Sequence, residues 1–344
     1  MKKNYLFLAA AATMFTACVQ TDVVNDIPEP QQQAISFDAF ANKTTRAEIN
    51  STEDLETVNE GQFTVWGWKT QRDAKNTVTP IFTGQVVNWD ATKGWFYTPL
   101  KYWDKMATYE FYAAAPKKGS ENFSMDANKK ISISNVVSGV ATGNDAATDY
   151  LITRNVTTHN GADGGTVNFT FSHIMSKITV NVIKADALAD FTVTLTDLSM
   201  EGWDKNSGTF TQDKEVEIET TSAEGITTTK MVLKEWELET TETDKGTHTF
   251  LTAATQALSK EDNEAYKVGS YLMVPQENVD LKFTISYKIG DETFLAHTGT
   301  IEDQTWATNT HYIYTITVGP DAILFDVAKV DNWITDNTGG TTIQ

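Results

Sequence analysis

The side chains that could do chemistry in this sequence include five histidines, one cysteine, nine tryptophans and 46 carboxylates. No two histidines form an H-x-x-x-H or similar ligand pair; they are His159, His173, His248, His297 and His311. The sequence has no nucleophile elbow, phosphate-binding loop or dinucleotide-binding glycine motif. Paired carboxylates could hydrolyse glycosides, but nothing singles out one pair. The sequence therefore predicts no catalytic residue, no metal site and no enzyme.

The one cysteine, Cys18, lies at the end of a targeting segment. Lys2 and Lys3 precede the apolar run 5–12, which is too short to span a bilayer as a helix. Phe15-Thr16-Ala17-Cys18 resembles a bacterial lipobox, in which the cysteine becomes the first mature residue and is acylated. The alternative is an ordinary secretory signal with an incidental cysteine. We expect a lipoprotein signal peptide over residues 1–17, a covalent lipid such as palmitate at Cys18, and no other cofactor.

The charge of the chain excludes two classes of partner. Its 46 acidic residues outnumber 27 Lys and Arg residues, so the formal charge is −19. Nucleic-acid binding needs a basic face, and electrostatic docking on anionic lipid needs clustered cations. The single cysteine also excludes an internal disulfide and a cysteine-based zinc cluster.

The elements that follow are short and alternate in hydrophobicity. Residues 18–33, with two prolines and three consecutive glutamines, are predicted to form a tether. Ile35, Phe37 and Ala39 then alternate as a first strand, and the capping-box spacing of Ser51 and Asp54 predicts a short helix after it. Many short strands follow, which is typical of β-sandwiches. The turn-rich stretch 159–165 divides the chain into domains over 34–162 and 163–344.

Two further patterns allow a functional and a structural interpretation. Trp66 and Trp68 share one face of the predicted strand 63–68, where they could stack on a sugar; we favour core filling, because an indole buries a large area. Strands 215–219 and 235–239 each carry three alternating glutamates. Calcium usually takes its ligands from irregular loops, so solvated outer faces are favoured there. Like charges opposite one another are unfavourable, so these strands should not be in-register neighbours.

Several motifs in order resemble the fimbrillin-like lipoproteins of Bacteroidota, the subunits of type V pili. After the lipobox, the motifs are Ile35-Ser-Phe37, Thr44-Thr45-Arg46-Ala47, Phe63-Thr-Val-Trp-Gly67, Trp95-Phe-Tyr-Thr-Pro99 with Tyr102-Trp103, Tyr109-Glu-Phe-Tyr-Ala-Ala-Ala-Pro116, Val167-Asn-Phe-Thr-Phe-Ser-His173 with Lys177-Ile178, and His311-Tyr-Ile-Tyr-Thr-Ile-Thr-Val318 before Trp333. One departure is Asp104, where the family often has proline. The departure affects a turn.

The resemblance implies an all-β fold of two transthyretin-like β-sandwich domains in tandem, and assembly by strand exchange. The precursor would be exported to the outer membrane as a lipoprotein. A trypsin-like surface protease would cut between Arg46 and Ala47, which makes 34–46 a removable first strand. Ile35, Phe37 and Ala39 would fill a groove before the cut, and a strand from another fimbrial subunit would fill it afterwards. The implied function is a structural subunit of an adhesive cell-surface pilus.

The C-terminal strand bears on the role of such a subunit. Ile323, Phe325 and Val327 alternate on one face, and the tail after Trp333 is polar. If this strand is donated, the chain is a stalk subunit. If it completes its own domain, little remains to donate. We favour self-completion, and with it a tip-like or accessory role. The alternative function is a surface lipoprotein that binds glycans through exposed aromatics and never polymerises.

Overall fold

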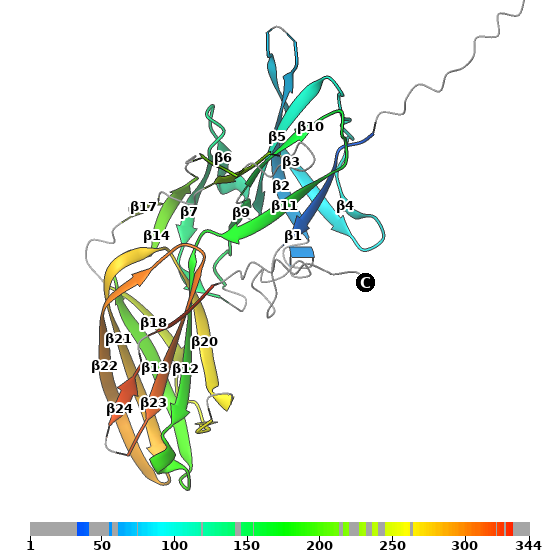
Figure 1. Ribbon diagram of the computed structural model, residues 1–344. Coiled ribbons are helices and arrows are strands. Elements are labelled where there is room, and N and C mark those ends of the chain that lie inside the picture. Colours follow the sequence, from blue (N-terminus) through cyan, green and yellow to red (C-terminus); the bar gives the residue numbers. More distant parts are fainter. Residues whose placement is uncertain are drawn as a thin grey trace, which may run out of the picture. The chain divides into compact units, whose positions relative to one another are not determined.

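The computed structural model describes residues 33–40, 55–56, 61–73, 75–117, 120–141, 146–153, 155–212, 216–219, 227–231, 236–239, 245–261, 264–320, 322–326 and 328–332 (Figure 1). Almost all of these residues lie in strands or turns, and two single-turn 3-10 helices interrupt them, η2 at Ser120–Asn122 and η3 at Asp186–Leu188. No described helix has the length and apolar character needed to cross a membrane. The predicted all-β class is confirmed.

The first sheet has ten strands. They are β1 (Ser36–Phe40), β2 (Gln62–Gln71), β3 (Val78–Asp90), β4 (Gly94–Phe96), β5 (Ala107–Ala115), β9 (Leu151–Thr153), β10 (Asn155–Asn160), β11 (Thr166–His173), β15 (Val216–Glu219) and β16 (Thr227–Met231). The main path runs β1-β11-β9-β5-β10-β16-β15; β2 joins it through β5, β3 pairs with β2, and β4 pairs with β3. Strand β1 is therefore an edge of this sheet, beside β11 (Figure 1).

Strand β2 contributes to two apolar cores because its neighbouring side chains point to opposite faces. Phe63 and Val65 join a cluster with residues of β1, β3, β5 and β11, which we call the first core. Trp66 joins a second core on the other face, together with Tyr112 of β5. The four-stranded sheet that covers the second core consists of β6 (Phe123–Met125), β7 (Ile131–Val137), β14 (Ser207–Thr211) and β17 (Trp236–Glu239).

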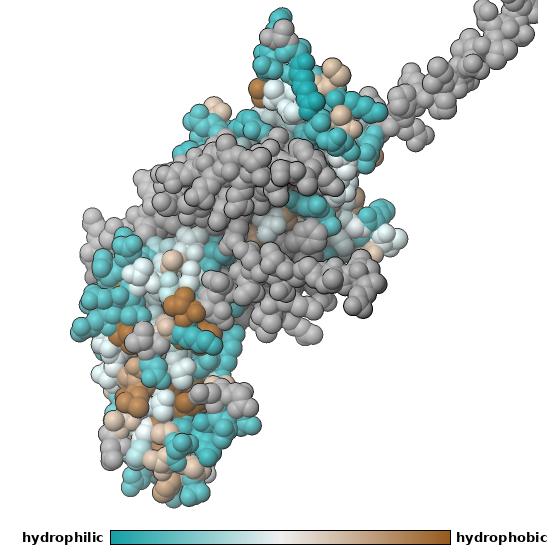
Figure 2. Space-filling model, viewed as in Figure 1, coloured by the Kyte–Doolittle hydropathy of each residue, from teal (hydrophilic) through white to brown (hydrophobic). Residues whose placement is uncertain are grey.

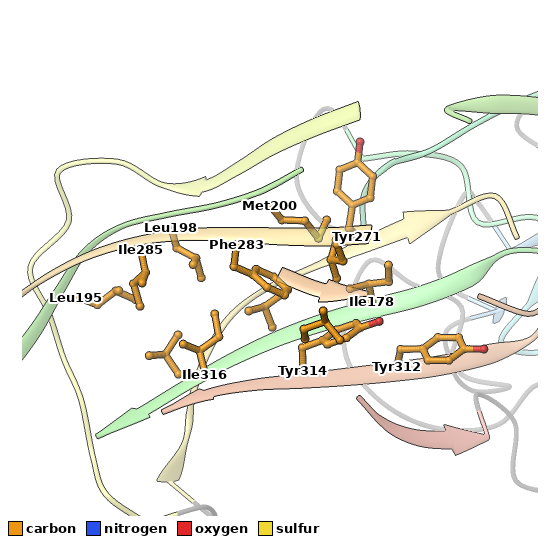
Figure 3. Packing of buried hydrophobic residues seen from close by; sticks show 14 of the residues in the cluster. Ile178, Leu195, Leu198, Met200, Tyr271, Phe283, Ile285, Tyr312, Tyr314 and Ile316 are labelled. Carbon is orange, nitrogen blue, oxygen red and sulfur yellow. The ribbon is translucent and has the colours of Figure 1, made fainter. Parts of the chain in front are cut away.

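A third core lies between two further sheets. The six-stranded sheet holds β8 (Gly139–Val140), β12 (Ser176–Lys184), β20 (Tyr266–Met273), β23 (Thr310–Val318), β24 (Ile323–Phe325) and β25 (Lys329–Asn332). The five-stranded sheet holds β13 (Val193–Trp203), β18 (Gly246–Leu251), β19 (Gln256–Ala257), β21 (Gln276–Ile289) and β22 (Glu292–Trp306). Figure 3 shows Ile178, Tyr314 and Ile316 of the six-stranded sheet facing Leu195, Phe283 and Ile285 of the five-stranded sheet. This is the layered packing of a β-sandwich.

Apolar side chains are concentrated in these cores. On the face seen in Figure 2, most of the described surface is hydrophilic, and hydrophobic side chains form small separate spots.

Three local predictions have different outcomes. The acidic strands are not neighbours, as expected: β15 pairs with β16, and β17 pairs with β14. Of the predicted short helix, only Leu55 and Glu56 are described, and both are helical; the rest lies outside the described residues. The interpretation of 159–165 as turn was wrong at its start, because His159 and Asn160 belong to β10.

The division of the chain at 162/163 stays a prediction. Strand β11 follows that position in sequence, yet Val167, Phe169 and Phe171 belong to the first core. This core therefore draws on both sides of the proposed boundary. The predicted tether at 18–33 lies outside the described residues except for Gln33.

Candidate functional site: the groove filled by the first strand

Strand β1 lies parallel to β11, with Phe37 opposite Val167 and Ala39 opposite Phe169. Its side chains alternate as the sequence predicts. Ile35, Phe37 and Ala39 have exposed fractions of 1%, 4% and 0%. Ser36 and Asp38, on the other face, are half-buried. One face of this short strand therefore fills an apolar groove.

The groove is lined by aromatic rings. The ring of Phe37 stacks on Phe169 of β11 with 5.6 Å between centroids, and meets Phe82 of β3 edge-on at 5.3 Å. It also contacts Tyr97 at 5.4 Å and Phe111 of β5 at 5.8 Å. Four aromatic contacts around one side chain make Phe37 the largest single anchor of the strand. We refer to this arrangement as the Phe37 groove.

Backbone hydrogen bonds hold the segment just before β1 against the loop that follows β4. The amide of Ile35 donates to the carbonyl of Lys101 at 2.8 Å, and the amide of Trp103 donates to the carbonyl of Gln33 at 3.0 Å. The Tyr97 hydroxyl donates to the carbonyl of Ile35 at 2.9 Å. Burial raises the pKa of this phenol above its ordinary value, so the hydroxyl keeps its proton at neutral pH. Tyr97 therefore both lines the groove and forms a hydrogen bond with the segment that leads into β1.

Trp103 connects this loop to β10. Its indole stacks on the imidazole of His159 with 5.4 Å between centroids, and its indole nitrogen donates to the carbonyl of Gly165 at 3.2 Å. Burial lowers the pKa of His159, so the imidazole is neutral at pH 7. His159, like Trp103, is therefore a packing residue at the rim of the groove.

Asp104, the departure from the family pattern, organises the turn after Trp103. Its carboxylate accepts bonds from the amide of Met106 at 3.0 Å, from Gln71 at 2.7 Å and from Lys69 at 3.2 Å. The hydrogen bond from the backbone amide of Met106 is the main reason why the pKa of Asp104 is lowered. The aspartate fixes this turn by side-chain bonds where proline would fix it by its ring.

The C-terminal strand pairs with the chain's own β23. Strand β24 lies antiparallel to Ile316–Val318, and β25 continues along Thr310–Ile313. Phe325 stacks on Phe283 with 6.1 Å between ring centroids, and a Cβ added to Gly299 would collide with the Phe325 ring. Ile323 and Phe325 pack against the third core, whereas Val327 lies outside the described residues.

The other predicted site residues cannot be placed. Cys18, Arg46 and Ala47 all lie outside the described residues. Within the part of the chain that the structure describes, no three His, Cys, Asp or Glu side chains are grouped so that they could hold a metal ion.

Comparison with known proteins identifies the family of the chain. The fimbrillin-like family matches residues 45–333, which is most of the sequence. The chain belongs to the fimbrillin-like family. No curated protein sequence matches this fimbrillin-like protein.

Three solved structures are similar to this fimbrillin-like protein. A fimbrial protein from Bacteroides vulgatus shares 20% identity, with 88% of this chain and 99% of that one covered at a TM-score of 0.48. A protein from Bacteroides ovatus, described as a candidate cell adhesion protein, shares 16% identity, with 89% of this chain and 99% of that one covered at a TM-score of 0.49. The tip fimbrial protein Mfa3 from Porphyromonas gingivalis, truncated at its C-terminus, shares 11% identity, with 88% of this chain and 100% of that one covered at a TM-score of 0.36.

Proposed function

We propose that this fimbrillin-like protein is a structural subunit of an adhesive cell-surface pilus, assembled by protease-triggered exchange of its first strand. The observation that carries the proposal is the Phe37 groove. It is filled by an edge strand whose three inward side chains are buried, and the sequence continues from that strand to Arg46. Family membership supports a structural rather than a catalytic role.

The proposed processing step is hydrolysis of one peptide bond. Water adds across the bond between Arg46 and Ala47, which leaves a new carboxyl terminus on Arg46 and a new amino terminus on Ala47. Arginine at this position fits the cationic specificity of a trypsin-like surface protease. Release of the cut segment would expose the aromatic lining of the Phe37 groove and the unpaired edge of β11, which form a template for strand addition. A strand from another fimbrial subunit then occupies the groove, and because such contacts do not close on themselves, a filament grows.

We expect the Arg46→Ala variant to resist processing and to stay out of filaments that are assembled together with a donor subunit. Trypsin-like cleavage needs a cationic side chain before the scissile bond, and alanine removes it. Intact mass after treatment with an arginine-specific protease, which spares Lys43, measures processing, and electron microscopy of filaments assembled with a donor subunit measures incorporation. Lys43→Ala is the matched control, because it removes a nearby cation from the same segment and should leave processing intact. Filaments from Arg46→Ala subunits that keep their native N-terminus would contradict the proposal.

Export as an outer-membrane lipoprotein is a second part of the proposal, supported by the lipobox that ends in Cys18. We expect Cys18→Ala to yield an unlipidated precursor that no longer partitions with membranes, because one thiol carries the whole anchor. Metabolic labelling with a fatty acid and membrane fractionation test this. Normal acylated, membrane-bound protein from the variant would refute the anchor.

The role within the pilus is proposed from the C-terminal strand. Strands β24 and β25 complete the sheet of the chain's own third core, which favours an acceptor that donates no strand. A tip-like or accessory subunit has this property.

A further inference from the structure

A cleft of about 370 Å³ opens on the face of β2 that points away from the Phe37 groove. It lies between strands β2 and β3 on one side and η2 with β6 on the other. Trp66 and Trp68 of β2 and Phe123 of β6 form its aromatic part, with 6.3 Å between the ring centroids of Trp66 and Phe123. The tryptophans of β2 thus do more than fill the second core, because parts of both also line an open cleft.

Hydroxyl groups form most of the polar part of the cleft. Thr83, Ser120 and Ser124 contribute them, and Asp126 is the single ionisable side chain among the described residues that line it. One carboxylate oxygen of Asp126 already accepts the amides of Asn128 and Lys130, both at 2.8 Å. The cleft therefore offers aromatic surface and neutral polar groups together, which is typical of small-molecule sites.

The ammonium of Lys129, which lies beside Trp68 of the cleft, is already paired with a carboxylate. The ammonium of Lys129 lies 5.3 Å from the centre of the Trp68 ring and forms an ion pair with Glu110. Its charge is balanced by that carboxylate, so it does not make the cleft an anion site. A phosphate or sulfate group would find no cation among the described lining residues.

Two details of β2 and β3 keep the cleft open and leave one hydroxyl group without a hydrogen-bond partner among the described residues. Gly84, at φ +86°, occupies a bulge where the pairing of the two strands shifts. A Cβ there would lie 3.9 Å from the indole nitrogen of Trp66, so glycine keeps this part of the indole uncovered. The buried hydroxyl of Thr64, another lining residue, has no hydrogen-bond partner among the described residues. A buried polar atom without a partner is costly unless a ligand or water supplies one.

We propose that this cleft binds a neutral carbohydrate. The C–H faces of a sugar ring would lie against the indoles and Phe123, and its hydroxyls would bond Thr64, Thr83 and the serines. The site is complete within one chain, so it depends on neither proteolysis nor polymerisation. It would give the proposed pilus subunit a receptor-binding site on the face of β2 opposite to the one used for assembly.

The test is a glycan array that presents neutral and acidic oligosaccharides to the purified, unprocessed chain, followed by calorimetry with the best neutral ligand. Thr83→Arg places a long side chain into the cleft, and we expect at least about tenfold weaker binding. Thr79→Arg is the matched control, because Thr79 is also exposed on β3 but does not line the cleft. It should bind as the unmodified chain does.

Thr64→Val provides a second, isosteric test. Valine keeps the shape of threonine and removes only the hydroxyl, so we expect about five- to tenfold weaker binding, equivalent to one hydrogen bond. The midpoint of urea unfolding should not fall, because the hydroxyl has no protein partner among the described residues. A merely structural role for Thr64 would leave binding unchanged.

The proposal is overturned if no neutral glycan binds, if binding is confined to acidic glycans, or if Thr83→Arg binds as well as Thr79→Arg. Its failure is separable from failure of the assembly proposal. Arg46→Ala should bind the glycan normally while it stays out of filaments assembled with a donor subunit.

Discussion

Phe37→Ala should lower the free energy of unfolding by about 3–5 kcal/mol, the cost of removing a fully packed phenylalanine ring. The ring contacts Phe82, Tyr97, Phe111 and Phe169, and its exposed fraction is 4%. Alanine would leave a cavity that these rings cannot close without leaving their own packing. Urea unfolding of the unprocessed chain, followed by tryptophan fluorescence, measures the effect, because Trp95 and Trp103 lie in the same core.

Ser36→Ala is the matched control on the same strand. Ser36 faces away from the groove, and its hydroxyl shares an exposed 2.9 Å hydrogen bond with Thr166. We expect a change of at most about 1 kcal/mol, the usual net worth of such a bond. Equal small effects from both substitutions would show that β1 does not stabilise the first core. After cleavage at Arg46 and release of the segment, Phe37→Ala and unmodified protein become identical chains, so any remaining difference would also contradict the proposed processing.

Deletion of residues 320–344 should abolish cooperative folding of the third core. The deletion removes β24 and β25, which cover one edge of β23, and it removes Phe325 from its place beside Phe283 and Gly299. Backbone groups of β23 and apolar surface of the core would become exposed together. Circular dichroism during urea unfolding measures the loss. A folded monomer that only fails to polymerise would instead identify this segment as the donated strand.

Single substitutions give the same test without a truncation. Phe325→Ala should lower the free energy of unfolding by about 3 kcal/mol, since the ring is only half-buried and lies at the low end of phenylalanine truncations. Leu324→Ala is the control, because Leu324 is next to Phe325 in the strand and its own side chain is 61% exposed. Its effect should stay within about 0.5 kcal/mol, as for other surface substitutions. Equal effects would contradict self-completion.

The sequence predicts the inner face of β1 but not its partner. Alternation at Ile35, Phe37 and Ala39 is a local signal with a period of two, and it is visible without any knowledge of the fold. The parallel pairing with β11 joins residues such as Phe37 and Val167, which are far apart in the chain. Such pairing is decided by tertiary packing, and no local pattern reports it. The role of Tyr97 was missed for the same reason.

Local patterns also misplace residues that serve two purposes. The run from His159 contains asparagine and glycines, which predict a turn, yet His159 lies within β10 and stacks on Trp103. Trp66 was expected to be core and is 8% exposed, but that remainder lines the cleft beside Phe123. Periodicity can assign a side chain to one face of a strand. It cannot tell whether that face is closed along its whole length.

The position of β2 between two cores affects what the groove becomes once β1 has left. Phe63 and Val65 belong to the first core, which loses Ile35, Phe37 and Ala39, whereas Trp66 and Tyr112 on the opposite face belong to the second core, which loses none of its residues. The floor of the groove is thus supported from behind and does not depend on its occupant for its shape. An emptied subunit would present a preorganised receptor, and an arriving strand would spend little binding energy on reshaping it. The same backing keeps the vacant state from relaxing into a closed one, so the subunit would remain competent for assembly while it waits for a partner.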